Sequence, residues 1–486
     1  MRKTALCLAS LLAVSQIVSC GGEAIPDETK TPDTTTGPEV TSASDDPGLP
    51  DKTFGGAEVN FLTISERHNA NNYSIEVFAE EMNGEPINDA VYKRNTFVED
   101  KYDVKITETK SDDPKTDANL SIMAGDDTYQ VLLVGMDECM GVAQDGGLVD
   151  LNEVPYIDLS RSWWDQRVND AMTFGGITYL AAGDINIMDD NATWVTFFNK
   201  KIADDYNLPD LYEVVDSGKW TMDELLKNAR LTNTDLDGDS EITYKDRFGI
   251  GTDDWNFSNL LLGAGCKYWQ DNGSTLECVF YNDKTLSVCD KIFDIFYDKP
   301  TTVNSDLYWG IVEGTPNSTV LRKSFGEDRM TFYIASMLTY SLMRGMESDF
   351  GLIPLPKYDE SQENYISSIL PRNASSLSIP KTNQNLEMTG IVVEAMAAKS
   401  STTLTPAYYD YTIYGKGMRD EDSARMFDLV KQNRAVDIGA VFDFGGLIAG
   451  LHQLLHNDSR DVASCYASLI DGAKEAAKKT IEEIYN

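Results

Sequence analysis

The chain has 486 residues and a formal net charge of −38 at pH 7. Nucleic-acid phosphates and anionic lipid headgroups repel such an acidic chain, so we exclude nucleic acid as a partner and a membrane-surface role beyond an anchor. After the first twenty residues, no window of about 18 uninterrupted apolar residues occurs, so we expect no membrane-spanning helix in the remainder.

Residues 1–19 follow the pattern of a secretory signal peptide, with basic Arg2 and Lys3 before an apolar run. The run ends in Ile-Val-Ser-Cys, which resembles a bacterial lipobox whose cysteine is acylated and becomes the new N-terminus. We therefore expect Cys20 to anchor the protein by lipid at the outer face of the cell membrane, in a Gram-positive bacterium. A plain cleaved signal and a first transmembrane helix are the alternatives.

The next segment, residues 20–53, is rich in Thr, Asp, Pro and Gly and poor in apolar residues. Such a composition does not bury enough surface to fold. We expect this segment to be a disordered stalk between the lipid anchor and the folded part.

From residue 54 onward the chain is too long for one core and fits two lobes. Short apolar or alternating runs predict strands, and they are separated by helical stretches, which favours a mostly parallel sheet covered on both faces. An i, i+3, i+4 pattern over 473–484 predicts an amphipathic C-terminal helix. The predicted strands are 59–64, 102–107, 129–134, 350–354 and 376–379.

Several segments together resemble the extracellular solute-binding proteins of family 1. They are 88–106, 148–166, 175–185, 194–225, 350–367, 377–383 and 407–439. The resemblance implies an α/β fold of the type II periplasmic-binding-protein class, with two lobes and a ligand cleft between them. It also implies a sugar or oligosaccharide ligand that is passed to an ABC permease. The expected lobes are 54–190 with a return over 350–398, and 191–349 with a return over 399–486.

A saccharide presents flat CH faces edged by hydroxyl groups, which suit aromatic rings beside carboxylates, amides and arginines. Open α/β sheets bind ligands at the carboxyl ends of their strands, so polar residues that follow predicted strands are candidates. Each aromatic candidate has the alternative of filling a core, and each polar one of being a solvated loop end. The candidate ligand-binding residues are Glu66, Arg67, Asp137, Trp164, Asp184, Trp194, Trp255, Trp269 and Arg372.

The segment 235–246 resembles an EF-hand-type calcium loop, with carboxylates at positions 1, 3, 5 and 12. It departs from the usual pattern because Gly238 stands at position 4, Ser240 at position 6 and an aspartate at position 12. An acidic turn is the alternative. We expect a structural Ca²⁺ held by Asp235, Asp237, Asp239, the Glu241 carbonyl group and Asp246, and no cofactor for catalysis.

After Cys20 the chain has five cysteines, so at least one thiol is unpaired within a monomer. Cys266, Cys278 and Cys289 leave one disulfide possible, and sequence spacing does not assign it. His452 and His456 stand four residues apart, but two imidazoles without a third nearby ligand are weak evidence for zinc.

Three classes of function remain in view. The leading one is capture of a solute by closure of two lobes, without enzymatic activity. The alternatives are a surface glycan-binding lipoprotein that feeds a sensor, and a surface glycoside hydrolase, although carboxylate pairs decide nothing in a chain with 79 Asp and Glu residues. A dockerin-type component would need a second calcium loop, which the sequence lacks.

Overall fold

The structure is a computed structural model that describes residues 46–69, 72–273, 275–308, 317–343, 345–412 and 421–485. The predicted signal peptide 1–19, the acylation site Cys20 and residues 21–45 of the predicted stalk lie outside the described residues. Within the described ranges, no helix has both the length and the apolar character needed to cross a bilayer.

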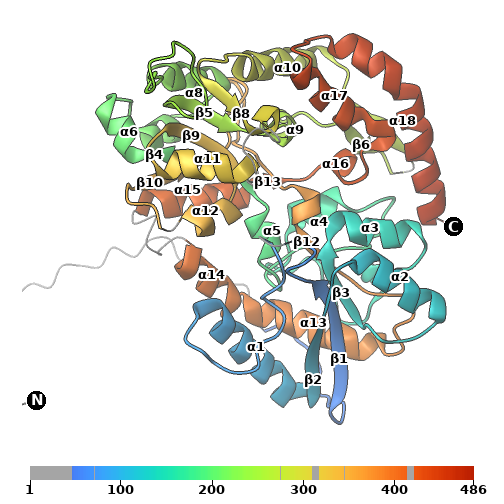
Figure 1. Cartoon of the computed structure of the whole chain (residues 1–486). Coiled ribbons are helices and arrows are strands. Elements are labelled where there is room, and N and C mark those ends of the chain that lie inside the picture. The colour runs from blue at the N-terminus through green and yellow to red at the C-terminus, as the bar shows by residue number, and fades with distance from the viewer. Residues whose placement is uncertain are drawn as a thin grey trace, which may run out of the picture. The chain divides into compact units, whose positions relative to one another are not determined.

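A four-stranded sheet in the order β12-β3-β1-β2 forms the centre of the first lobe (Figure 1). β1 pairs in parallel with β2 and β3, whereas β12 runs antiparallel to β3. The prediction of a mostly parallel sheet is confirmed. Tyr102, which we expected in a strand, instead ends the preceding helix, where Asp103 adopts the left-handed conformation that terminates it. The strands are β1 (Ala57–Ile64), β2 (Val104–Ser111), β3 (Val131–Gly135) and β12 (Ser375–Ser378).

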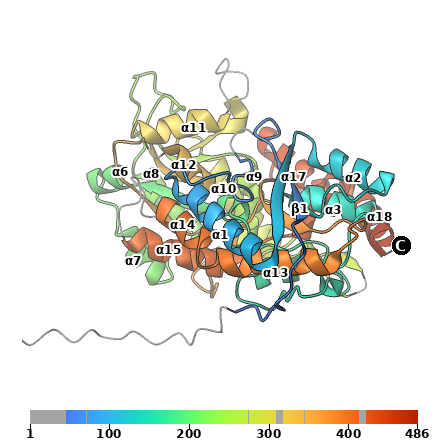
Figure 2. The same ribbon diagram turned by 90° about the horizontal axis from the view of Figure 1, so that it is seen from below.

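Helices cover both faces of this sheet. α1 begins with Pro86, whose fixed backbone angle suits a first helical position, and it lies beside α13 on one face (Figure 2). Because side chains alternate along a strand, Val59 and Phe61 pack in one core cluster and Leu62 and Ile64 in another that continues into the second lobe. The helices of this lobe are α1 (Pro86–Tyr102), α2 (Pro114–Ala124), α3 (Met136–Gln144), α4 (Gln166–Ala171), α13 (Leu386–Ser400) and α14 (Leu404–Thr412).

A five-stranded mixed sheet in the order β10-β4-β9-β5-β8 forms the second lobe. Its strands are β4 (Trp194–Asn199), β5 (Phe248–Thr252), β8 (Thr302–Asn304), β9 (Met330–Ser336) and β10 (Phe350–Ile353), with a separate hairpin of β6 (Trp269–Asp271) and β7 (Leu276–Cys278). The helices are α6 (Lys200–Asp205), α7 (Leu211–Asp216), α8 (Met222–Arg230), α9 (Trp255–Gly263), α10 (Asp283–Phe296), α11 (Asn317–Gly326), α12 (Leu338–Met343), α15 (Glu421–Gln432), α16 (Ile438–Phe442), α17 (Leu447–His456) and α18 (Val462–Tyr485). α18 confirms the predicted C-terminal helix.

Two of the segments that connect the lobes are neighbours. The first contains α5 (Met188–Asn191) and leads into β4, and the second leads from β11 (Ser367–Ser368) toward β12. They are joined by a hydrogen bond from the Leu370 amide to the Ala192 carbonyl at 3.2 Å and by a bridge between Thr193 and Ile369. The two crossings therefore form one paired connection.

Arg434 fixes this connection. It lies in β13 (Arg434–Ala435), which pairs with β11, and its side chain is only 5% exposed. Its guanidinium group donates to Asp190 at 2.6 Å and, through Nε, to Asp165 at 3.0 Å, and it lies 3.3 Å from Asp189. Asp165 also caps the N-terminus of α4. One buried cation thus joins the first lobe, the first crossing and β13.

Three predicted boundaries differ from the structure. β10 pairs with β4, so 350–353 belongs to the second sheet, because strand-like sequence does not reveal which sheet a strand joins. α14 packs against α1, so the final return to the second lobe begins after residue 412. Residues 46–53, predicted as stalk, pack on the first lobe: Leu49 contacts its core and Lys52 forms an ion pair with Glu387 at 2.6 Å.

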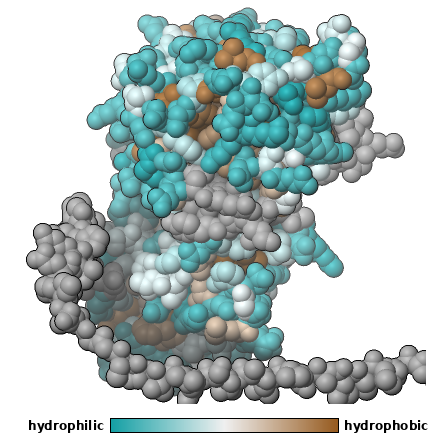
Figure 3. Space-filling view, turned by 90° about the vertical axis from the view of Figure 1, so that its left-hand side faces the viewer, coloured by the Kyte–Doolittle hydropathy of each residue, from teal (hydrophilic) through white to brown (hydrophobic). Residues whose placement is uncertain are grey.

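The cysteines beyond Cys20 are all free thiols, so the disulfide left open among Cys266, Cys278 and Cys289 does not form in this structure. Space-filling Figure 3 shows a mostly hydrophilic face with scattered apolar patches, as expected for a chain of high net charge.

We expect Arg434→Met to lower the free energy of unfolding by about 3–5 kcal/mol, because three buried carboxylates then lose their cation. Arg425→Met is the matched control: its pairs with Asp216 and Asp422 are about half exposed, so its loss is expected to cost about 1 kcal/mol or less. Urea unfolding followed by circular dichroism measures both values. Equal losses in the two variants would contradict the role given to Arg434.

Candidate interlobe binding site

The carboxyl ends of the strands in both sheets adjoin the crossing segments. Gly135, the last residue of β3, pairs with Ser375, the first residue of β12. In the second lobe, Ser336 at the end of β9 pairs with Trp194 at the start of β4. Since the crossings lead into Trp194 and toward Ser375, both carboxyl edges open beside the same connection. Ligands of open α/β sheets bind outside such edges.

A cavity of about 140 Å³ lies at this connection and is lined from both lobes. Amide and aromatic side chains make up half of its wall and aliphatic ones most of the rest, and Tyr408 donates a hydrogen bond to Asn191 at 2.9 Å. Asn72 reaches across to the Asn373 carbonyl oxygen at 2.5 Å. Flat rings beside amide groups offer the apolar and hydrogen-bonding surfaces that a sugar ring requires. The lining includes Asn72, Tyr73, Ile187, Asn191, Met337, Tyr340, Tyr408 and Tyr411.

At the carboxyl edge of the first sheet, the structure brings together several predicted residues. Glu66 and Arg67 follow β1 and are exposed, and Arg67 lies 3.5 Å from Asp112 beyond β2. Asp137 follows β3, and the charge of Arg372 lies near enough to act on it. In the sequence, Glu66, Arg67 and Asp137 follow predicted strands, whereas Arg372 precedes one. Their role in binding stays a prediction.

The carboxyl group of Asp137 lacks a full set of hydrogen-bond partners. Burial raises the pKa of its carboxyl group, whereas Arg372 and backbone amides lower it. Its Oδ1 atom is buried and has no hydrogen-bond partner among the described residues. Its neighbour Glu138 is satisfied by the Gly135 amide at 3.0 Å and by His68 at 3.4 Å. Asp137 is therefore a carboxylate at this edge with one oxygen that has no partner among the described residues.

The carboxyl edge of the second sheet carries a cluster that our sequence reasoning missed. Asp253 and Asp254 follow β5, and Asp306 follows β8. Asp254 accepts hydrogen bonds from His456 and, at 2.7 Å, from Asn304, and its amide donates to Asp306 at 2.9 Å. The signal was present as two aspartates directly after the run Phe-Gly-Ile-Gly-Thr, but its two glycines hid the strand.

Within this edge cluster, Asp253 resembles Asp137 in lacking a partner. Its Oδ1 atom is buried and accepts no hydrogen bond from any described residue. Burial raises its pKa to about 8, and the charges of Asp306 and Asp254 contribute. Each lobe thus has, at the carboxyl edge of its sheet, one aspartate with an oxygen that lacks a hydrogen-bond partner among the described residues.

The predicted tryptophans separate into two groups. Trp164 and Trp269 are each 2% exposed, and Trp194 is 6% exposed. The Trp164 indole donates to Glu394 at 3.0 Å, and Trp269 packs edge-on against Phe444. Trp255 is half-buried beside Asp254 at the carboxyl edge of the second sheet, where its ring meets His452 edge-on. A stacking role therefore stays a prediction for Trp255, whereas the other three rings are enclosed by protein.

Asp184 lies in a different cavity, of about 340 Å³, which Trp164 also lines. There it accepts a hydrogen bond from Thr405 at 2.9 Å, and burial raises the pKa of its carboxyl group. Asp189 and Arg434 line the same cavity. The structure therefore does not place Asp184 and Trp164 with Glu66 and Asp137.

The predicted calcium loop brings three of its carboxylates together. Oxygens of Asp235, Asp237 and Asp239 lie within 4.8 Å of one another, and among the described residues this is the one such group of acidic, His or Cys side chains. Asp246 differs from the prediction: its carboxylate accepts hydrogen bonds from the amides of Leu236 at 2.9 Å and Thr243 at 3.0 Å. It orders the loop backbone instead of joining the group.

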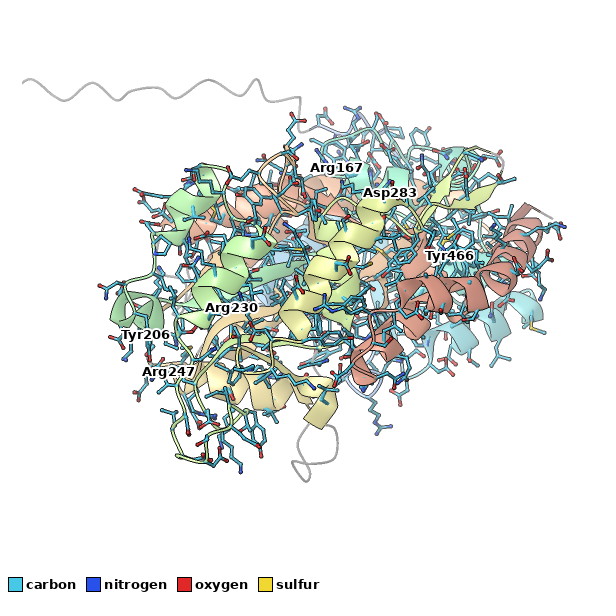
Figure 4. All side chains as sticks on the ribbon, turned by 90° about the horizontal axis from the view of Figure 1, so that it is seen from above. Arg167, Tyr206, Arg230, Arg247, Asp283 and Tyr466 are labelled. Atoms are coloured by element: carbon cyan, nitrogen blue, oxygen red, sulfur yellow. The ribbon has the colours of Figure 1, made fainter. Side chains whose placement is uncertain are left out.

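The ends of this loop are fixed to the second lobe. Thr234 and Arg247 pair through their backbones, and the Thr234 hydroxyl lies 2.8 Å from the hydroxyl of Tyr206. Arg247 also donates to Tyr206 at 3.1 Å, and Figure 4 shows these two side chains close together at the outer part of the lobe. The loop is thus presented on a fixed base.

Comparisons with known proteins agree with this geometry. The family model described as bacterial extracellular solute-binding protein matches residues 79–387, more than half of the chain. No curated protein sequence matches the chain.

Solved structures with the same fold cover most of the chain. One is the galacto-N-biose/lacto-N-biose I-binding protein of an ABC transporter from Bifidobacterium longum, in complex with lacto-N-biose (TM-score 0.57, 13% identity, 89% of this chain and 98% of that chain). Another is the maltose/maltodextrin-binding domain from Bdellovibrio bacteriovorus bound to maltotriose (TM-score 0.53, 12% identity, 88% of this chain and 100% of that chain). A third is an ABC substrate-binding protein from Listeria monocytogenes in complex with cycloalternan (TM-score 0.53, 12% identity, 88% of this chain and 98% of that chain). The fold is therefore the two-lobed α/β fold of periplasmic-binding-protein-like proteins.

The raised pKa of Asp253 predicts a pH dependence. The folded protein keeps this proton up to about pH 8, whereas an unfolded aspartate releases it near pH 3.9. Between these values the folded state binds more protons, so this group's contribution to stability falls as pH rises. We expect Asp253→Asn to flatten the decline in melting temperature between pH 5 and 8. Asp204→Asn, at an exposed position, should keep the wild-type slope; a wild-type slope in Asp253→Asn would refute this prediction.

Proposed function

We propose that this chain, which belongs to the family of bacterial extracellular solute-binding proteins, captures a sugar or oligosaccharide between its lobes and delivers it to an ABC permease. The observation that carries the proposal is a cavity at the crossing that both lobes line with tyrosine, asparagine and aliphatic side chains, beside the carboxyl edges of both sheets. Family members bind solutes, so we propose binding and release with no enzymatic step.

The chemistry of the site favours a polyhydroxyl ligand. Asp137 and Asp253 each present a buried oxygen that lacks a donor among the described residues, and sugar hydroxyl groups are such donors. Tyr73, which is half-buried in the cavity wall, offers ring surface to the CH face of a sugar. The structural neighbours with bound lacto-N-biose and maltotriose support the same ligand class.

Lobe closure is the proposed mechanism. Two paired crossing segments join the lobes, so a change in a few backbone angles there alters the distance between Asp137 and Asp253. A ligand that touches both lobes binds the closed state more tightly and shifts the population toward it. The permease then distinguishes the closed from the open form; a sensor protein as the reader is the alternative.

The N-terminal sequence supports an extracellular, lipid-anchored location. Acylated Cys20 would hold the domain at the outer face of the cell membrane of a Gram-positive bacterium, and residues 21–45 would act as the spacer. An anchor of this kind keeps the binding domain near its permease.

The test is a thermal-shift screen with lacto-N-biose, maltotriose and cycloalternan, followed by solution scattering. We expect at least one saccharide to raise the melting temperature and to reduce the radius of gyration, since ligand binds only the folded and preferentially the closed state. Asp137→Asn should weaken binding about tenfold or more, because a charged hydrogen bond is lost. Asp204→Asn serves as the control. Failure of every saccharide in a wider panel would overturn the proposed ligand class.

We also propose that the loop 235–246 binds one structural Ca²⁺ through Asp235, Asp237 and Asp239, the Glu241 carbonyl group and water. Three converging carboxylates support this, as does Ser240, which adopts a positive φ of 72° at the position where EF-hand loops need a sharp turn. Asp246 then stabilises the loop backbone without touching the ion.

For this site we expect Ca²⁺ to raise the melting temperature relative to protein treated with chelator, and Asp237→Asn to abolish most of that increase. Asp223→Asn, on the exposed start of α8, is the matched control and should retain it. Calorimetric titration counts the ions. An unchanged melting temperature in Ca²⁺ would show that the loop is an acidic turn.

A further inference from the structure

β8 is an edge strand of the second sheet (Figure 1). A second cavity lies beside it. This cavity, which we call the β8 pocket, has a volume of about 440 Å³ and is lined by the loop 240–243, the end of α10, β8 and the end of α17. Its apolar wall includes Ile242, Phe296, Leu307 and Leu455. Leu307 is 45% exposed, so it adds apolar surface that a ligand in the pocket can cover.

One polar group in the wall lacks a partner. Thr302 is 6% exposed, and its hydroxyl oxygen makes no hydrogen bond with any described residue. By contrast, the hydroxyl group of Tyr297 already donates to the carbonyl groups of Leu454 and Ser459 at 2.9 and 2.8 Å. A buried hydroxyl without a partner is uncommon and costs free energy, so it points to a ligand atom.

The β8 pocket adjoins the cluster at the carboxyl edge of the second sheet. Asn304 lines the pocket and donates to Asp254 at 2.7 Å, so one side chain belongs to both places. Leu455 lines the pocket, and the next residue, His456, also bonds to Asp254. A ligand that contacts the edge cluster therefore has an apolar recess directly next to it.

We propose that the β8 pocket holds the aryl group of a glycoside whose sugar occupies the interlobe site. This proposal rests on the proposed function and narrows its ligand class to saccharides that carry an aromatic aglycone. The apolar wall takes the ring, and Thr302 donates to a polar atom on it. The ion pair between Lys299 and Asp458, at 2.7 Å, balances the charges of these two side chains, and the exposed carboxylate of Glu241 in the same lining disfavours an anionic aglycone.

The experiment compares matched ligands by calorimetric titration of the full mature protein. Maltose, cellobiose and lactose are each tested free and as the 4-nitrophenyl glycoside. We expect the nitrophenyl form of the bound sugar to bind at least tenfold more tightly, because burial of an aryl ring is worth more than one factor of ten in affinity. The plain phenyl glycoside should gain less, since it offers Thr302 no acceptor.

Two variants locate the effect. Leu307→Asp, at an exposed position that folding tolerates, should reduce the aryl advantage to about one while leaving affinity for the free sugar unchanged. Leu120→Asp, which is 60% exposed on α2, is the matched control and should keep the full advantage. Thr302→Val should make the phenyl and nitrophenyl glycosides bind equally well.

The outcomes separate the two proposals. If free sugars bind and the aryl forms bind no better, the aglycone proposal is wrong and the proposed function stands. An aryl advantage that persists in Leu307→Asp would also overturn it. So would 4-nitrophenol alone binding as tightly as the nitrophenyl glycoside, because the pocket would then be an independent site. If no free or aryl saccharide binds, the proposed ligand class itself fails.

Discussion

The buried guanidinium group of Arg434 is the interaction on which the arrangement of the lobes depends. Three aspartates from two distant parts of the chain approach this one cation, which is 5% exposed. Removing any of these charges from water is costly, and only their mutual contact offsets it. Because Asp165 caps α4 while Asp189 and Asp190 lie on the first crossing, the cation sets where the connection between the lobes starts.

Burial disfavours the charged form of Asp189 within this cluster. Burial raises its pKa to about 8, even though Arg434 opposes the shift. The protonation state of Asp189 matters to the whole cluster, since its charge affects every neighbour there. Lys431 shares Asp190 at 3.1 Å and so spreads positive charge over the same region. At the crossing, the cost of burying carboxyl groups is therefore set against the attraction of Arg434 and Lys431.

Asp254 lies next to the β8 pocket, because Asn304 in the pocket wall donates a hydrogen bond to it. Its oxygens are held by Asn304 and His456, and its amide is held by Asp306, so its position is defined from three directions. Asp253 beside it keeps an oxygen without a described partner. A site with one fixed aspartate and a neighbouring aspartate that keeps an unpaired oxygen is preorganised. Binding then costs little free energy for ordering the protein.

Local signals in the sequence determined most elements of the first lobe and the acidic loop. Apolar runs such as 59–64 and 129–134 predict strands because burial on both faces demands continuous apolar character. Glu66, Arg67 and Asp137 could be placed at one edge since parallel strands end on the same side. The pattern of aspartates at 235, 237 and 239 also brought these residues together, because the spacing of a tight loop is itself local.

Only the tertiary structure decided what depends on partners remote in sequence. β10 joined the second sheet because β4 offered an antiparallel edge, and Trp164 was enclosed because Glu394, 230 residues away, accepts its indole hydrogen. The edge cluster of Asp254 with His456 unites residues 202 positions apart. A sequence pattern records each residue's own preference, whereas packing and charge pairing choose among many possible partners. The ligand site depends on that choice, and so it became visible only in the fold.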